Sequence, residues 1–122
     1  MRIINITSKR ITIDAKTRAY GEKKIQKLID YIPRQARRSA TAELIIEKIG
    51  QKGGSKIEAQ IILTLPEKQL IAKEQLDGVL AAIDGVEQKI LGQIRRYKTE
   101  RLADSKRAGG IFAKIKKSLR RR

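Results

Sequence analysis

A regular stripe of apolar side chains between residues 75 and 102 constrains the fold more than any other feature of this sequence. Apolar residues that recur every three or four positions line one face of a helix, so the stripe predicts a single long helix. Its members are Leu76, Val79, Leu80, Ile83, Val86, Ile90, Ile94 and Tyr97. A helix that is apolar along one side must bury that side against another layer of structure. The residues before the helix have to supply that layer.

The opposite side of the predicted helix combines small residues with basic ones. Glycine inside a helix costs roughly 0.5–1 kcal/mol relative to alanine, so we expect outward glycines where a partner approaches the backbone closely. The residues on this side are Gly78, Ala81, Gly85, Lys89, Gly92, Arg95 and Arg96. They predict a positively charged surface for close approach.

Three segments before the helix alternate between apolar and polar residues, as half-buried strands do. They are residues 42–49, 56–65 and 69–73, and the glycine-rich loop between the first two predicts an antiparallel hairpin. Residues 2–7 form a further β-branched run. The polar positions predict a wet outer sheet face that carries Glu43, Glu47, Glu58, Gln60 and Thr64.

A first helix is predicted between the first two of the four strands. Asp14 is a candidate N-cap, and Pro33 ends the helix because proline disfavours helical geometry in the residue before it. The predicted core side of this helix carries Gly21, Ile25, Leu28 and Ile32, with Tyr20 and Tyr31 near it. Lys23 and Lys27 lie on the other side.

The predicted order of elements is β-α-β-β-β-α. It favours the α+β class, with a mostly antiparallel four-stranded sheet and two helices packed on one face. We expect residues 1–102 to form this domain and residues 103–122 to form a basic linker and tail. The tail is expected to be disordered in the free protein and to become helical or ordered when it binds RNA, with a lipid surface or a protein groove as the alternatives.

Charge indicates the class of partner. The chain holds 29 Lys and Arg against 13 Asp and Glu, a net charge of +16. Residues 92–122 carry 12 of these basic side chains and only 2 acidic ones. Such an excess attracts polyanions through counterion release, and nucleic acid is the usual one. An anionic lipid surface would attract the same positive charge. The remaining alternative is that the excess of basic residues only keeps the protein in solution.

Several function classes are disfavoured by what the sequence lacks. It has no cysteine and no histidine, which removes thiolate nucleophiles, the usual zinc sites and the commonest general base at neutral pH. Its acidic residues are not clustered at metal-ligand spacing. We therefore expect no enzyme, metal, cofactor or small-molecule substrate. No segment is typical of a signal peptide or a membrane span, so we expect a cytoplasmic protein without a membrane partner.

The predicted long helix resembles a known family. Its sequence holds Ala81-Ala82-Ile83-Asp84 after an acidic residue and a short apolar stretch, then Lys89-Ile90, then Gln93-Ile94 followed by Lys98. This arrangement resembles the ribosome hibernation-promoting factor family, which includes ribosome-associated inhibitor A and protein Y. Residues 3–8 and 23–28 are also similar to that family, and the resemblance covers about residues 2–101.

The resemblance implies a fold similar to double-stranded RNA-binding domains and a partner, the small ribosomal subunit with its rRNA. Members bind in the channel used by messenger and transfer RNA, and they inhibit translation under stress or in stationary phase. Their basic helix residues face rRNA, and a monomer is expected when the protein is free. The RNA-binding set predicted here is Lys23, Lys24, Lys27, Lys89, Arg95, Arg96, Lys98, Arg101, Lys106 and Arg107.

Two departures and several alternatives accompany this resemblance. Gly78-Val79-Leu80 stands where members often have an aromatic residue or methionine, and the sequence is too short for the dimerisation domain with which long members pair ribosomes. We expect no pairing by that route. For the lysines of the first helix, the alternative interpretation is a solvated helix face without any contact to RNA. For the basic residues from Arg95 onward, the alternative role is to complement the negative end of the helix dipole. A general double-stranded RNA- or DNA-binding module is the alternative function.

Overall fold

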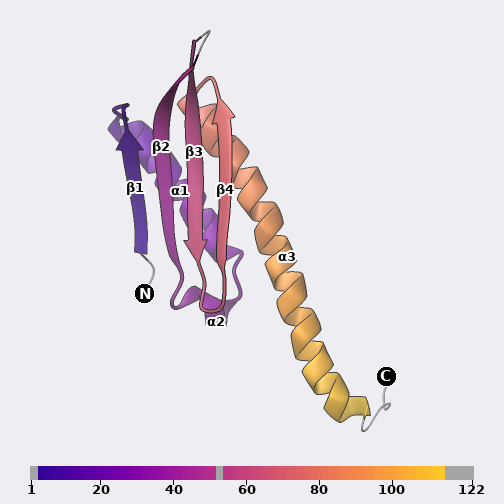
Figure 1. Ribbon diagram of the computed structural model, residues 1–122. Coiled ribbons are helices and arrows are strands. Elements are labelled where there is room, and N and C mark those ends of the chain that lie inside the picture. The colour runs from indigo at the N-terminus through magenta and orange to yellow at the C-terminus, as the bar shows by residue number, and fades with distance from the viewer. Residues whose placement is uncertain (1–2, 52–53, 115–122) are drawn as a thin grey trace.

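The computed structural model describes residues 3–51 and 54–114, and it confirms the predicted α+β class (Figure 1). The elements are β1 (Ile3–Lys9), α1 (Ala15–Asp30), α2 (Arg34–Arg37), β2 (Thr41–Gln51), β3 (Gly54–Thr64), β4 (Gln69–Leu76) and α3 (Val79–Lys114). The short helix α2 is the one addition to the predicted order. Within the described residues, no helix is both long enough and apolar enough to cross a membrane.

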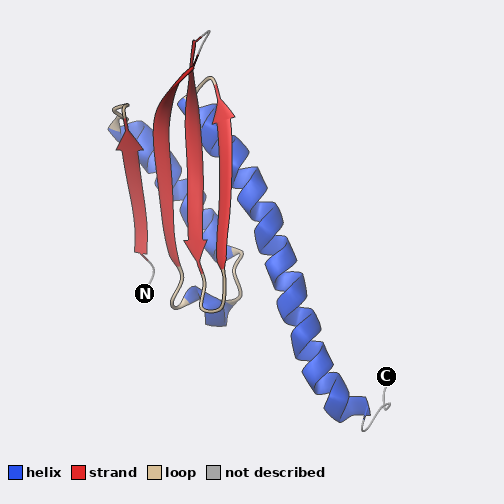
Figure 2. Ribbon diagram, viewed as in Figure 1, coloured by secondary structure: helices blue, strands red, loops and turns tan. Residues whose placement is uncertain are grey.

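The four strands form one mixed sheet in the order β1-β2-β3-β4. β1 pairs with β2 in parallel, and the other two pairings are antiparallel. The parallel pairing follows from α1, because a helical crossover returns the chain to the end of the sheet where β1 began. In the view of Figure 2, α1 and the first turns of α3 lie behind the sheet, so one sheet face is covered and the other is open.

The core lies between the sheet and the two long helices, and it is aliphatic. Leu44, Ile61, Ile83, Ile90 and Ile94 are among its fully buried side chains. This composition agrees with the alternation of the strands and the stripe of the long helix, which place these residues on facing surfaces.

Each long helix approaches the sheet through a glycine. A Cβ atom on Gly21 of α1 would lie 2.9 Å from Leu44 Cδ2, and one on Gly85 of α3 would lie 2.7 Å from Glu74 Cγ. The prediction that Gly85 faces outward is therefore wrong, because α3 packs its backbone against β4 at this point. Gly78 and Gly92 have open space where a Cβ would stand.

The long helix begins later than predicted. β4 continues to Leu76, and α3 begins at Val79 after a bend at Asp77 and Gly78. Leu76 fits the helical stripe by spacing, but it also continues the strand alternation and packs against the core from β4. Leu80, another member of the stripe, is half exposed, whereas Leu91 is buried.

The long helix also ends later than predicted. α3 continues to Lys114, so the expected linker at residues 103–110 is helical. Once a helix is formed, each added residue gains a hydrogen bond, and Ala, Arg and Lys are good helix formers. The tail predicted from Ile111 onward overlaps the end of α3, and residues 115–122 lie outside the described residues. The division into parts at residue 102 stays a prediction.

The first helix has the predicted start and an earlier end. Thr17 N donates to Asp14 Oδ1 at 2.8 Å, which confirms the N-cap, and this bond lowers the pKa of Asp14. α1 ends at Asp30, with Tyr31 as its C-cap. Tyr31 was expected near the core, but its side chain is 43% exposed. The connection that follows contains α2, which sequence patterns did not predict.

The outer sheet face carries the predicted polar residues at intermediate exposure, together with some apolar ones. Glu43 and Gln60 lie there as expected. The strand register places Ile62 beside Ile71 on the same face, and Ile71 is 44% exposed. The alternation correctly predicted which polar residues lie on the outer face. It did not predict that two isoleucines lie there as well, because β-branched residues are favoured in strands on either face.

Candidate nucleic-acid interface

Lys24 ties α1 to α3 through two carboxylates. Its Nζ lies 3.1 Å from Glu87 Oε1 and 3.5 Å from Asp84 Oδ1. Tyr20 completes the contact, because its hydroxyl donates to Asp84 Oδ1 at 2.5 Å and its ring centroid lies 5.3 Å from Lys24 Nζ. These four residues form the interhelix network. They come from positions more than sixty residues apart in the chain.

Burial and protonation make this network structural. The Glu87 side chain is only 7% exposed and that of Lys24 is 25% exposed. The hydrogen bond to Glu87 raises the pKa of Lys24, although burial alone would lower it. The bond to Asp84 raises the pKa of Tyr20. Both donors are protonated at neutral pH, so the Lys24 ammonium is already committed to the packing of the two helices.

Lys89 is also held by contacts inside the protein, at the edge strand β4. Its Nζ lies 2.7 Å from Glu74 Oε1 and donates to Lys73 O at 3.0 Å. Gln93 Nε2 donates to Ile71 O at 2.8 Å. β4 is an edge strand, and an edge presents unpaired carbonyls that invite pairing with another strand. Two side chains of α3 therefore cover the edge of the sheet.

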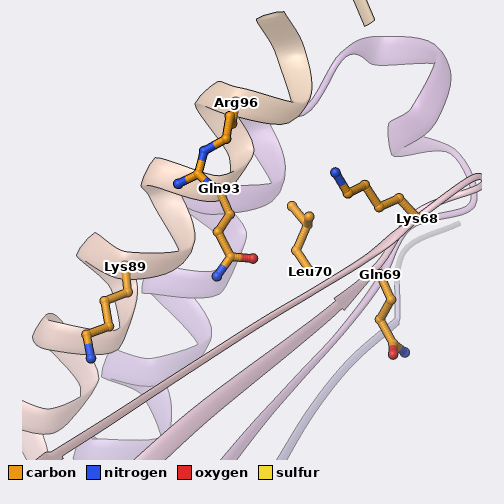
Figure 3. A pocket seen from close by; sticks show the side chains of 6 residues that line it. All are labelled: Lys68, Gln69, Leu70, Lys89, Gln93 and Arg96. Atoms are coloured by element: carbon orange, nitrogen blue, oxygen red, sulfur yellow. The ribbon is translucent and has the colours of Figure 1, made fainter. Parts of the chain in front are cut away.

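The edge strand β4 also lines a pocket of about 350 Å³ between β4 and α3 (Figure 3). The lining side chains are Lys68, Gln69, Leu70, Lys89, Gln93 and Arg96. Lys68 pairs with Glu100 at 3.1 Å, so Arg96 is the cation of this pocket without a partner among the described residues. The pocket thus carries less uncompensated charge than its lysines suggest.

Five of the predicted RNA-binding residues are exposed and make no side-chain hydrogen bond or ion pair within the described part of the chain. We call them the free helix cations. They are Lys23, Lys27, Arg95, Arg96 and Lys98. Long cationic side chains that have no internal partner are available to phosphate groups, which bind them without breaking any bond inside the protein.

The free helix cations of α3 point in two directions. Steps of three and four residues lead from Glu87 through Leu91 to Arg95 and Lys98, so these two continue the side of α3 that faces α1. Arg96 lies instead beside the pocket at β4 (Figure 3). The structure therefore gathers four free helix cations along the two-helix side and separates Arg96 from them.

Comparison with known proteins identifies the family. Residues 4–102 match the family described as sigma 54 modulation protein and S30EA ribosomal protein. The chain belongs to this family. The match covers both long helices down to residue 102, and it confirms the resemblance to hibernation-promoting factors. Membership in the S30EA family indicates a ribosome-associated protein. Among curated proteins, none matches the chain.

Two solved structures share the S30EA fold with this chain. The N-terminal domain of Protein Y from Thermus thermophilus has a TM-score of 0.65 and 25% sequence identity, and the match covers 80% of this chain and 99% of that one. A ribosomal subunit interface protein from Coxiella burnetii has a TM-score of 0.63 and 22% identity, with coverage of 81% and 99%. The second likeness is one of fold alone.

The rest of the predicted site in this S30EA chain lies further along α3. Arg101, Lys106 and Arg107 belong to that helix, beyond the last residue whose side chain the structure describes. Two exposed residues at the end of α1 and the start of α2, Tyr31 and Arg34, lie outside the predicted RNA-binding set. Spacing was the available signal for Tyr31, because it follows Lys27 by four positions.

Chemically, the described residues offer exposed positive charge and hydrogen-bond donors. They contain no group of three or more His, Cys, Asp or Glu side chains placed to hold a metal ion. The free helix cations are exposed rather than buried in a cleft. This arrangement fits the binding of an extended polyanion.

Proposed function

We propose that this protein is a ribosome hibernation factor that binds rRNA of the small ribosomal subunit and inhibits translation. It acts in the cytoplasm under stress or in stationary phase, and it occupies the channel of messenger and transfer RNA. The observation that carries the proposal is the family match over residues 4–102, which spans the elements that present the free helix cations.

The electrostatics support a phosphate-rich partner. The net charge of the chain is +16. The free helix cations make no ion pair within the described residues, so no internal ion pair has to break when they bind a phosphate. Lys24 and Lys89 contribute by fixing the helices, so the free cations are held on a rigid scaffold. Binding to such a scaffold loses less conformational entropy than binding to a flexible basic segment.

Cosedimentation tests the proposal. The full chain is mixed with purified small subunits and run through sucrose gradients at increasing salt. We expect it to travel with the small subunit at low salt and to leave at high salt. If all five free helix cations meet phosphates, the plot of log affinity against log salt has a slope of about −3 to −5.

Translation assays separate a binding factor from an enzyme. Inhibition by a hibernation factor requires about one protein per small subunit and leaves the rRNA intact. Inhibition far below this ratio, together with cleaved rRNA, would contradict the proposal. Equal affinity for small subunits and for random RNA or DNA duplexes would favour the alternative, a general duplex-binding module.

A further inference from the structure

The corner between α1 and α2 carries an exposed aromatic ring among basic residues. We call it the α1–α2 corner, and its residues are Lys27, Tyr31, Arg34 and Arg38. Tyr31 is 43% exposed, whereas Tyr97 is buried and Tyr20 belongs to the interhelix network. The Tyr31 hydroxyl has no hydrogen-bond partner among the described residues. The Tyr31 side chain is therefore open to a partner.

The ring continues a row of free helix cations. Lys23, Lys27 and Tyr31 follow one another at steps of four residues, which places them along one side of the helix. Arg34 is exposed at the start of α2, just beyond the end of this row. A nucleic-acid strand that follows the lysines along α1 reaches the Tyr31 ring next.

The backbone of the corner is held in place. Arg37 Nη2 donates to Asp30 O and to Ile32 O, each at 3.0 Å. These bonds satisfy carbonyls at the end of α1, and the positive charge complements the negative end of the helix dipole. Pro33 restricts the chain further. The ring is therefore presented by an ordered turn, which lowers the entropy lost when a ligand binds.

The third helix carries a free helix cation at the level of the ring along the helix axis. Tyr20 meets Asp84 and Lys24 meets Glu87, so α1 and α3 run in the same direction. Continuing this register along both helices brings Tyr31 level with Arg95. The nearest acid on α1 is Asp30, and its carboxylate accepts from Gln26 Nε2 at 3.2 Å. Lys27 of α1 and Arg34 of α2 thus lie on either side of Tyr31 in the chain.

We propose that an unpaired RNA base stacks on the Tyr31 ring while its flanking phosphates contact Lys27 and Arg34. This inference rests on the proposed function and extends it to a residue outside the predicted RNA-binding set. Exposed aromatic rings bind unstacked bases through their faces, and neighbouring cations hold the backbone. A base paired inside a duplex has no free face, so the corner selects single-stranded RNA.

Affinity measurements on a graded set of variants test the stacking. Tyr31→Phe keeps the ring, Tyr31→Leu keeps apolar volume without a π face, and Tyr31→Ala removes both. We expect Tyr31→Phe to bind small subunits as the wild type does, and the Leu and Ala variants to bind about 5- to 150-fold more weakly. Equal binding by Phe, Leu and wild type would overturn the proposal. Thermal melting of each variant confirms that the fold is kept.

A spectroscopic readout places the base on the ring. The sequence has no tryptophan, so Tyr31→Trp creates a single indole reporter at the corner. We expect a short unstructured RNA to quench the emission of this indole. A duplex RNA of equal charge should leave the emission unchanged when it is added until the same fraction of the protein is bound. Equal quenching by both RNAs, or no quenching by the single strand, would overturn the proposal.

The same variants distinguish this inference from the proposed function. If the wild type does not bind small subunits, the proposed function fails, and the quenching experiment still tests the stacking. If the wild type binds subunits but Tyr31→Leu binds equally well, only the stacking fails. If Tyr31→Leu weakens binding to subunits but not to single-stranded RNA, the ring contacts a ribosomal protein, which also overturns the proposal.

Discussion

Lys23 and Lys24 are neighbours on α1, yet they belong to different regions of the molecule. Lys24 lies in the interhelix network, where it pairs with buried Glu87 and with Asp84. Lys23 is exposed and makes no side-chain bond within the described residues. A single step of about 100° around the helix therefore separates a lysine that holds the fold from one that is free to bind.

The same contrast appears on α3. Lys89 covers the edge of β4 and pairs with Glu74, whereas Arg95 is exposed and free. Both pairs of residues were equivalent as basic positions in the sequence. The difference between them teaches that a count of cations overstates a nucleic-acid surface, because some cations are already neutralised inside the protein.

The largest expected effect comes from removing two free helix cations together. We expect Arg95→Ala with Arg96→Ala to lower affinity for small subunits by about tenfold or more and to reduce the salt slope by about one for each of the two side chains that contacts a phosphate. Thermal stability should change little, since exposed side chains without partners contribute little to folding. Cosedimentation at several salt concentrations and a melting curve measure both quantities.

A charge-matched control decides whether position matters. Lys9 and Lys73 are exposed and lie by register on the open sheet face, away from the helices. Lys9→Ala with Lys73→Ala removes the same charge and should leave affinity nearly unchanged. Equal losses from the two double variants would show that net charge alone drives binding. The single variants of Arg95 and Arg96 then show which side of α3 meets RNA.

The next effect separates Lys24 from Lys23 directly. Lys24→Ala leaves the buried Glu87 carboxylate without its partner, so we expect the free energy of unfolding to fall by about 1–3 kcal/mol. Lys23→Ala should leave stability within about 0.5 kcal/mol of the wild type and weaken binding to subunits a fewfold. Chemical denaturation and cosedimentation of both variants give the two numbers. The comparison fails if Lys23→Ala is the more destabilising variant.

Much of the fold could be predicted because its determinants are local in sequence. The alternation of residues 42–49 and 56–65 marks the hairpin, and Asp14 marks the start of α1. Leu76 shows where such signals fail. It fits both the period of a strand and that of the helix, and only the pairing of β4 with β3 decides between them.

Less of the candidate site could be predicted because its determinants are long-range. Nothing near Lys24 in the sequence reveals that Glu87 will accept from it, and nothing near Lys89 reveals the carbonyl of Lys73. The family resemblance supplied the helices that carry charge, but the structure is needed to separate paired cations from free ones. Tyr31 lies at the border between the core side of α1 and the row of Lys23 and Lys27, so its spacing alone does not decide its exposure, which is 43%.

The smallest expected effect is a pH dependence that isolates the interhelix network. The pKa of Tyr20 is raised above its ordinary value of 10.0 by the hydrogen bond to Asp84. A group whose pKa is higher in the folded state stabilises fully below its unfolded pKa and loses this contribution as pH rises through the folded value. We therefore expect the melting temperature of the wild type to fall above about pH 10.

Tyr20→Phe tests this sign. The variant keeps the ring near Lys24 but has no hydroxyl to ionise, so its melting temperature should be slightly lower at pH 7 and should fall less steeply above pH 10. The pKa of Lys24 is raised mainly by Glu87, which both proteins keep, so Lys24 acts in the same direction in both of them. Parallel curves from pH 7 to 11.5 would show that the Tyr20 bond adds nothing to folding. If the two curves converge at high pH, the Tyr20 hydrogen bond stabilises the fold. Tyr20 then belongs with Lys24 to the interhelix network, which holds the fold, and not with the free helix cations, which are available to bind.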